Sequence, residues 1–285
     1  MKETLVRSCK AVLRTVLPKS MVQRLALMAE RRALARLPTA VVDSRHLRAQ
    51  SSLDINRLMR DSTTDAAWND VVGTLNELLP DDVYGGVNIG DRRALYYLVL
   101  GLNVRNLLEV GTHIGASAIH LASALRDSGQ ANVHLTTVDI RDVNASVGSP
   151  WREQGLDAPP SVMVERLGCA GLVTFYVATA SSFLATTEQH FDFIFLDGSH
   201  AAADVYREIP LALQRLAPGG VIVLHDFFPG LAPLWTGGEL IAGPWLAVER
   251  LRQEGARITA LPLGALPWPT KLGSTVTSLA VLLRN

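Results

Sequence analysis

The chain has little of several features that mark common protein classes. Only two of its 285 residues are cysteines, Cys9 and Cys169, and their spacing gives neither a zinc site nor a disulfide framework. Its 27 basic residues equal its 27 acidic ones, so the chain as a whole lacks the basic character of a nucleic-acid-binding protein. No apolar run approaches the roughly 18 residues of a membrane-spanning helix. We therefore expect a reduced, cytoplasmic setting, no transmembrane segment and no nucleic-acid partner.

The N-terminal segment has a composition of its own. Residues 1–36 hold nine Lys or Arg residues against only Glu3 and Glu30, and apolar residues recur there near the helical period. Basic residues interrupt the first apolar stretches, which argues against a signal peptide. Basic amphipathic helices of this kind can pack on the domain core or on a second subunit, or lie on an anionic membrane surface. We expect packing and keep peripheral membrane contact as the alternative.

From residue 85 onward, apolar segments and helical patterns alternate. Strands are expected over 106–110, 133–139, 173–177, 191–196 and 221–225, and helices over 116–127, 181–190 and 202–216. The strands are apolar throughout, as expected where both faces of a parallel sheet are covered. Pro218-Gly219-Gly220 predicts a turn before the fifth strand. This order predicts an open, doubly wound α/β sheet with right-handed crossovers.

The segment Leu107–Ser117 joins the first strand of this sheet to the helix that follows. A dinucleotide fingerprint at this point would read G-x-G-x-x-G, but counted from Gly111 the other two glycine places hold His113 and Ala116. The pattern E-x-G-x-x-x-G instead resembles motif I of the class I S-adenosylmethionine (SAM) methyltransferases. The resemblance implies a SAM-binding turn formed by Glu109, Gly111, Thr112, His113, Gly115 and Ser117.

The end of the chain also resembles this family. Methyltransferases of this class finish with a β-hairpin that places an antiparallel strand in the sheet, and strand patterns over 257–262 and 277–283 follow a helical pattern over 240–254. We therefore expect a Rossmann-like sheet of seven strands, mostly parallel with an antiparallel last strand, in a methyltransferase domain over residues 85–285. Residues 1–84 would be a helical extension that covers the acceptor pocket or joins two copies in a homo-oligomer.

Two further residues are candidates for contact with the nucleoside of SAM. Asp139 ends the second strand, 24 positions after Gly115, where an acidic residue accepts hydrogen bonds from ribose hydroxyls. Asp142 is a nearby rival, and a ribose contact alone would not separate SAM from NAD. Ser181 follows the third strand, where the family places the adenine, and its other role is that of a helix N-cap.

Acidic and histidine residues follow the fourth and fifth strands. Phe191–His200, with the pattern F-D-x-I-F-L-D-G-x-H, resembles the strand-four motif of small-molecule O-methyltransferases, and the fifth strand ends in a His-Asp pair. Because these strands should be neighbours, their tips should meet at one crevice. The residues expected there are Asp197, His200, His225 and Asp226.

A hydroxyl group is a weak nucleophile until it loses its proton, so a base or a metal ion must activate it. The metal-dependent, catechol-type O-methyltransferases combine both. The resemblance implies Asp197, His225 and Asp226 as ligands of Mg²⁺ or Mn²⁺, with His200 as the base. Two departures stand out: histidine replaces the family's lysine base, and His-Asp replaces its Asp-Asn pair. Imidazole suits Mn²⁺ or Zn²⁺ better than Mg²⁺, and metal-free catalysis by His200 stays open.

Taken together, these patterns predict a SAM-dependent O-methyltransferase that acts on a hydroxyl of a small molecule or sugar. A NAD-dependent oxidoreductase would share the sheet and Asp139, but it should carry the missing glycines. A non-catalytic SAM-binding scaffold should have lost the acidic and histidine residues at the strand tips. No Asn-Pro-Pro-Tyr motif follows the fourth strand, which disfavours methylation of nucleic acid.

Overall fold

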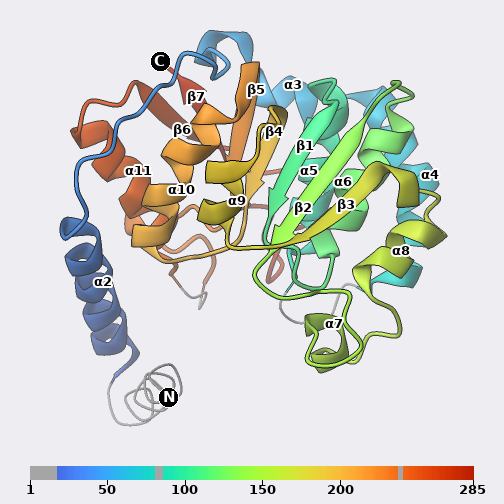
Figure 1. Ribbon diagram of the computed structural model, residues 1–285, viewed down its shortest axis with the longest axis horizontal. Helices are drawn as coiled ribbons and strands as arrows, with labels where there is room; N and C mark the ends of the chain where they lie inside the picture. Colours follow the sequence, from blue (N-terminus) through green and yellow to red (C-terminus); the bar gives the residue numbers. More distant parts are fainter. Residues whose placement is uncertain (1–17, 81–85, 237–239) are drawn as a thin grey trace.

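A computed structural model describes residues 18–80, 86–236 and 240–285 (Figure 1). Its centre is a seven-stranded sheet with the order β3-β2-β1-β4-β5-β7-β6. The strands are β1 (Asn106–Val110), β2 (His134–Asp139), β3 (Val173–Val177), β4 (Phe191–Leu196), β5 (Leu216–Leu224), β6 (Ile258–Pro262) and β7 (Ala280–Arg284). The first five are parallel, and β7 is antiparallel to both β5 and β6. The predicted Rossmann-like fold is confirmed.

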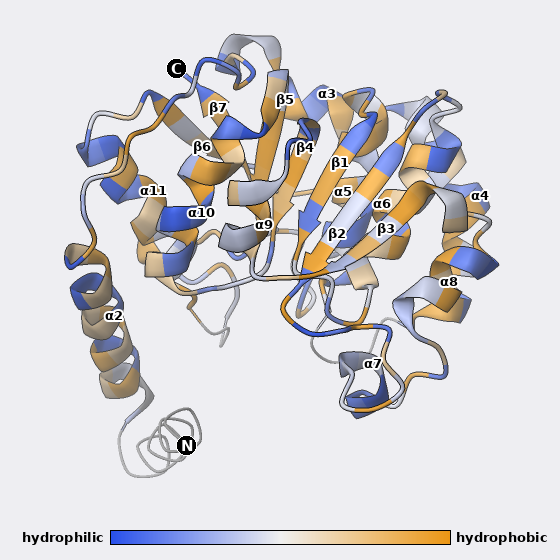
Figure 2. Cartoon of the chain, viewed as in Figure 1, coloured by the Kyte–Doolittle hydropathy of each residue, from blue (hydrophilic) through white to orange (hydrophobic). Residues whose placement is uncertain are grey.

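Helices cover both faces of the sheet. One face carries α4 (Ser62–Leu78), α5 (Ile89–Gly101), α6 (Ala116–Asp127) and α8 (Pro160–Arg166). The other face carries α9 (Ala180–Thr186), α10 (Ala202–Gln214) and α11 (Gly243–Gln253). Within β1, Leu107 packs in the first layer and Leu108 in the second, and both are fully buried. This two-sided burial is the reason that the strands are mostly apolar, as the largely orange strands of Figure 2 show.

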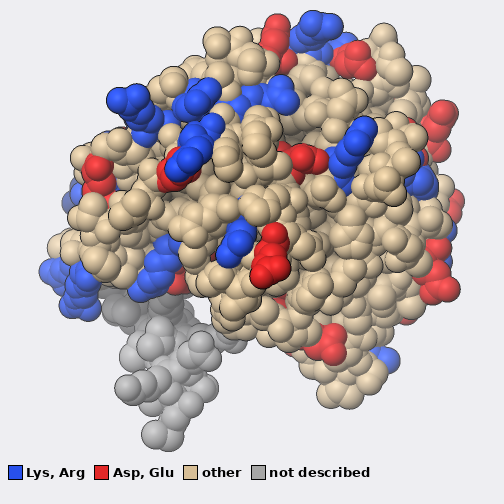
Figure 3. All heavy atoms as spheres, turned by 45° about the horizontal axis from the view of Figure 1, so that its top comes forward, with Lys and Arg blue, Asp and Glu red and all other residues tan. Residues whose placement is uncertain are grey.

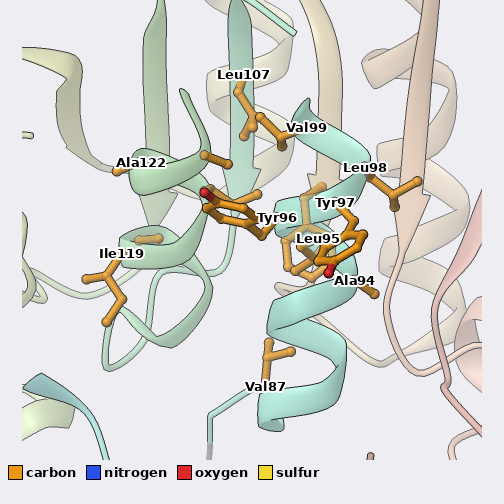
Figure 4. Close-up of a cluster of buried hydrophobic side chains, with 14 of the residues drawn as sticks. Val87, Ala94, Leu95, Tyr96, Tyr97, Leu98, Val99, Leu107, Ile119 and Ala122 are labelled. Atoms are coloured by element: carbon orange, nitrogen blue, oxygen red, sulfur yellow. The ribbon is translucent and has the colours of Figure 1, made fainter. Parts of the chain in front are cut away.

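The core of the first layer is built around α5 (Figure 4). Leu95, Tyr96 and Leu98 of this helix are fully buried, and α5 packs against α6. The ring of Tyr96 meets that of Trp68 from α4 edge to face, with 5.4 Å between the ring centroids. Helix α4 precedes residue 85, so part of the predicted extension packs in the same core as α5 and α6. The boundary at residue 84 stays a prediction.

The segment before α4 that contains His46 and Arg48 pairs with the start of β5, a contact that the sequence did not predict. Pro218-Gly219-Gly220 was expected to form a turn, but β5 begins at Leu216 and includes these residues. Their backbone is paired by the earlier stretch: Gly219 N donates to His46 O at 2.8 Å and Arg48 N donates to Gly220 O at 2.9 Å. The segment is nevertheless irregular, because the register of β5 on β4 shifts between Leu216 and Val221 and Gly219 has a φ of +80°. The chain therefore bends where the sequence predicted a turn, but within the strand, and His46 and Arg48 pair with the bend. The short helices α3 (Ile55–Leu58) and η1 (Gln50–Ser52) follow this contact.

Helix α2 (Lys19–Ala35) projects from the body beside α10 and α11 (Figure 1). Glu30 accepts a hydrogen bond from Ala202 N at 2.7 Å, and Arg250 Nη2 donates to Leu37 O at 2.7 Å. On its outer side Met21, Leu25 and Met28 lie one helical turn apart and are about half exposed. The more N-terminal helix expected within residues 1–17 lies outside the described residues.

The surface view in Figure 3 shows the edge of the molecule at the amino ends of the parallel strands. Basic and acidic groups are separated there by uncharged surface, with several Lys and Arg side chains gathered at the upper left. The mixture matches the zero net charge of the chain. Among the residues that the structure describes, no helix is both long and apolar enough to cross a membrane.

Candidate active site

A cavity of about 1110 Å³ lies at the carboxyl ends of the parallel strands, which is where open α/β sheets bind their ligands. Its walls come from the loops after β1, β2, β3, β4 and β5, and from the segments before α5 and around residue 270. Eight of the residues predicted from the sequence line it: Gly111, His113, Asp139, Ser181, Asp197, His200, His225 and Asp226.

Gly111 fixes how closely the tips of β1 and β4 approach each other. Its φ of +98° lies in the left-handed region, and a Cβ atom at this position would stand 2.3 Å from the carbonyl oxygen of Asp197. Only glycine avoids both problems. The close approach brings the backbone of the turn to the cavity wall beside Asp197.

Gly111→Ala is expected to lower the free energy of unfolding by at least about 2 kcal/mol. The left-handed backbone costs about 1 kcal/mol, and overlap with the Asp197 carbonyl adds a packing cost. Urea unfolding measures the loss. Gly129→Ala is the matched control, because its φ of +64° is also left-handed but its added methyl group meets no atom within 4 Å. Equal losses in the two variants would contradict the close packing.

Asp139 joins the turns that follow β1 and β2. One carboxylate oxygen accepts a hydrogen bond from His113 N and the other accepts one from Arg141 N, both at 2.9 Å. His113 has a φ of +47°, so its backbone is held in an uncommon conformation at this contact. Burial lowers the pKa of the His113 ring. Each carboxylate oxygen of Asp139 can accept further hydrogen bonds, and the residue lines the cavity.

Three residues predicted to contact SAM lie inside the turn instead of on the cavity wall. Glu109, Thr112 and Ser117 are almost completely buried. Ser117 Oγ and Thr137 Oγ1 each donate to a carboxylate oxygen of Glu109, and Thr137 Oγ1 also lies 2.6 Å from Thr112 Oγ1. Burial raises the pKa of Glu109 to about 7. The network holds β1, β2 and α6 together below the turn.

Gly115 belongs to the same turn and does not line the cavity either. It precedes α6 as the N-cap residue with a φ of +83°. A Cβ atom at Gly115 would lie 2.9 Å from Pro160, so glycine is needed here for packing. The assignment of Glu109, Thr112, Gly115 and Ser117 to the cofactor stays a prediction.

The buried Glu109 should make stability depend on pH. In the native state its pKa of about 7 lets it keep its proton up to about that pH, whereas the ordinary pKa of a glutamate is 4.5. Between these values the native state binds more protons than the unfolded chain, so the free energy of unfolding falls as pH rises, by about 3 kcal/mol in total. Glu109→Gln cannot titrate and should remove this fall. Urea unfolding at about pH 5 and pH 7.5 tests it, with the exposed Glu165→Gln as control. An unchanged pH slope in Glu109→Gln would contradict the assignment.

Asp197, His225 and Asp226 form a compact cluster at the tips of β4 and β5. One ligand atom from each lies within 4.8 Å of the others. His225 Nδ1 is 2.9 Å from Asp197 Oδ1 and 3.6 Å from Asp226 Oδ2, yet neither ring nitrogen has a partner in hydrogen-bond geometry. Burial lowers the pKa of His225, but the charges of Asp197 and Asp226 outweigh it and hold that pKa well above its usual range.

His200 joins this cluster from the loop after β4. Its Nδ1 lies 3.4 Å from Asp226 Oδ2, and about half of its side chain is exposed. Asp226 itself has a φ of +51°, which turns the chain sharply after β5. The four residues predicted to converge are therefore together.

Ser181 also lines the cavity, within the first turn of α9. The N-cap role considered for it belongs to Thr179, whose hydroxyl accepts a hydrogen bond from Ser182 N at 3.2 Å.

Sequence reasoning missed Asp91, a fully buried carboxylate behind the cluster. It lies in the first turn of α5, where Asn88 caps the helix and donates from Nδ2 to Asp91 Oδ2 at 2.7 Å. Asp91 Oδ2 is 3.4 Å from His225 Nε2, and Asp91 Oδ1 has no hydrogen-bond partner. An acidic residue at a buried helix start was the available signal, but nothing in the local pattern linked it to β5.

Comparisons with known proteins agree with the fold. Residues 108–227 match a family described as methyltransferase domain. The chain is 24% identical over 139 residues to a Dictyostelium discoideum protein named probable caffeoyl-CoA O-methyltransferase 3, a match that covers 48% of this chain and 50% of that protein. The chain therefore spans about half the length of this curated relative.

Solved structures share the fold. The O-methyltransferase TomG from Streptomyces achromogenes, solved in complex with SAM, has a TM-score of 0.50 and 21% identity, covering 79% of this chain and 91% of that one. An O-methyltransferase from Bacillus cereus has a TM-score of 0.51 and 20% identity, covering 79% and 92%. Likeness at these identities establishes the fold. Residues 108–227 therefore resemble a methyltransferase domain, and the sheet has the fold of these O-methyltransferase structures.

Proposed function

We propose that the chain is a SAM-dependent O-methyltransferase that methylates a hydroxyl of a small molecule or sugar. The observation that carries the proposal is the meeting of Asp197, His200, His225 and Asp226 at two adjacent strand tips, in the same cavity as Asp139. A class I fold that served only as a scaffold would not need this set of groups. The relatives named as O-methyltransferases support the same reaction.

The cavity fits SAM by the chemistry of its walls. Asp139 offers carboxylate oxygens to ribose hydroxyls, and the backbone of Gly111 and His113 lines the wall next to it. After β3 the cavity is lined by the small side chains of Thr179, Ala180 and Ser181, which leave room for the flat adenine base. SAM when bound supplies an electrophilic methyl group, so this chain has to bind the acceptor, orient its hydroxyl and remove its proton.

The cluster of Asp197, His225 and Asp226 fits a divalent metal ion, because carboxylate oxygens and an imidazole nitrogen are its usual ligands. A metal ion there would lower the pKa of an acceptor hydroxyl and fix its position. His200, beside Asp226 and partly exposed to the cavity, is the proposed base that takes the proton. In the alternative, metal-free form, His200 acts alone, and Asp226 holds its ring in place.

Turnover of methyl-labelled SAM with a panel of sugars, phenols and hydroxylated metabolites tests the proposal. We expect label on an oxygen atom of at least one acceptor class, and no hydride transfer with NADH. Transfer only to nitrogen or carbon acceptors would contradict the O-methyltransferase proposal. Addition of a chelator separates its two forms, because it stops the metal-assisted reaction and leaves the metal-free one unchanged.

The proposed acceptor is a small polar molecule that carries a hydroxyl group. Ile241 and the loop of Thr270, Lys271 and Leu272 line the cavity away from Asp139. Lys271 lies over the ring of Trp235, with 5.4 Å between its Nζ and the ring centroid. A mixed wall of apolar groups and one cation suits a small polar molecule, in line with a sugar or phenolic hydroxyl.

The role of the N-terminal extension is a separate proposal. The half-exposed Met21, Leu25 and Met28 form an apolar stripe on α2, which supports contact with a second copy of the chain, with Arg24 and Arg32 beside it on the same helix. The full-length protein should then sediment as a homo-oligomer, and Leu25→Glu should shift it toward the monomer. Binding of a monomeric protein to anionic vesicles would favour the membrane alternative. If the extension covers the acceptor pocket instead, Leu25→Glu should change the KM for the acceptor without changing the mass of the particle in solution.

A further inference from the structure

We propose that Asp91 is a positioning residue for the metal site, and that it holds His225 as an imidazole ligand that makes the site prefer Mn²⁺ or Zn²⁺ over Mg²⁺. This inference rests on the proposed metal-assisted function, and it adds a residue and a metal preference to it. Asp91 lies outside the predicted set of site residues.

The two nitrogen atoms on the edge of the His225 ring have different neighbours. Nδ1 lies toward Asp197 and Asp226, and Nε2 lies toward Asp91. Nδ1 lies 2.9 Å from Asp197 Oδ1 and 3.6 Å from Asp226 Oδ2, whereas Nε2 lies 3.4 Å from Asp91 Oδ2. Asp91 is close enough to Nε2 to favour the tautomer that carries the proton on this nitrogen, and in that tautomer the Nδ1 lone pair can bind a cation. The three ligand atoms within 4.8 Å are then one nitrogen and two oxygens.

Asp91 is well supported in this position. It is fully buried and lies in the first turn of α5, where the free backbone N–H groups of the helix favour a negative charge. Its backbone N donates to Asn88 Oδ1 at 3.1 Å while Asn88 Nδ2 donates to Asp91 Oδ2 at 2.7 Å. The other oxygen, Oδ1, has no hydrogen-bond partner. A buried carboxylate is costly to leave unpaired, so its place behind His225 indicates a partner that bears positive charge or donates a proton.

The donor set decides the metal preference. Mg²⁺ requires oxygen ligands in a nearly regular octahedron, whereas an imidazole nitrogen raises affinity along the series from Mn²⁺ to Zn²⁺. A ring whose orientation is fixed before the ion arrives strengthens this effect. The preference therefore depends on His225 and, through it, on Asp91.

Calorimetry and pulsed electron paramagnetic resonance on the full chain test the inference, with Mn²⁺ and Mg²⁺ as probes. We expect Mn²⁺ to bind at least about tenfold more tightly than Mg²⁺, with a nitrogen coupling in its resonance spectrum. Asp91→Asn, which keeps the shape of the side chain, should weaken Mn²⁺ binding by about 10- to 100-fold. His225→Asp should remove the nitrogen coupling and reverse the preference toward Mg²⁺. Asp65→Asn, on α4 and outside the cluster, is the control and should bind Mn²⁺ like the unaltered chain.

Equal affinity for the two ions, or unchanged Mn²⁺ binding in Asp91→Asn, would overturn the inference, and so would an absence of Mn²⁺ binding. Titration of S-adenosylhomocysteine without metal is read separately, so loss of that binding would count against the proposed function and not against the metal preference. If Asp91→Asn does not fold, His225→Asp still tests the metal preference. A variant that keeps the nitrogen coupling, or that still prefers Mn²⁺ over Mg²⁺, would overturn the inference.

Discussion

Replacing Asp139 with alanine is expected to weaken the binding of S-adenosylhomocysteine by about 100-fold or more. In the proposed complex the substitution removes two charge-assisted hydrogen bonds to the ribose, each worth about 1.5–3 kcal/mol. It also removes the acceptor of His113 N and Arg141 N, which Asp139 binds at 2.9 Å. Isothermal titration with S-adenosylhomocysteine measures the loss.

Asp142 is the matched control for this variant. It lies three residues further on, is exposed, and accepts a hydrogen bond from Asn144 N instead of lining the cavity. Asp142→Ala should bind S-adenosylhomocysteine within about twofold of the unaltered chain, since exposed substitutions of this kind have small effects. The opposite order, with Asp142→Ala the weaker binder, would move the ribose contact to Asp142.

The second large effect is expected at the cluster of Asp197, His225 and Asp226. If our proposal is right, Asp226→Asn should lower the rate of methyl transfer by about 100-fold or more, because Asp226 is both a proposed metal ligand and the partner of His200, and the substitution removes its charge. Asparagine tolerates the left-handed φ of +51° at this position, so the backbone turn after β5 should survive. Steady-state turnover of labelled SAM with an acceptor measures the rate.

Binding of S-adenosylhomocysteine shows whether Asp226→Asn leaves the rest of the cavity intact. Without metal, its affinity for the variant should stay within about threefold of that for the unaltered chain, since Asp139 and the turn after β1 are unchanged. Asp157→Asn, an exposed substitution of the same chemistry, should keep full turnover. A normal rate in Asp226→Asn would remove Asp226 from the account, both as a ligand and as the partner of His200.

The strand tips could be predicted from the sequence because they combine two local signals. An apolar run marks a buried strand, and a polar residue at its end marks the edge where ligands bind. Parallel topology then brings Asp139, Asp197 and Asp226 to one edge of the sheet without any knowledge of distances. The strands β1, β3 and β4 lie over the residues expected, because their boundaries are set by the same apolar runs.

Contacts between distant segments could not be predicted in this way. The extension of β5 back to Leu216 depends on His46 and Arg48, which precede it by about 170 residues. The burial of Glu109 depends on hydroxyl groups from β2 and α6. Asp91 approaches His225 only because the fold brings the start of α5 to the tip of β5, with α5 and β5 sharing one buried cluster. Such pairings lack a periodic pattern, so local spacing carries no signal for them.

Calorimetric titration of the purified chain tests whether the cavity beside Asp139 binds SAM. S-adenosylhomocysteine is the probe, with NAD as the control. We expect saturable binding of S-adenosylhomocysteine, lost in Asp139→Ala, and no binding of NAD. Binding of NAD, or no binding of S-adenosylhomocysteine with or without Mn²⁺, would contradict the proposal.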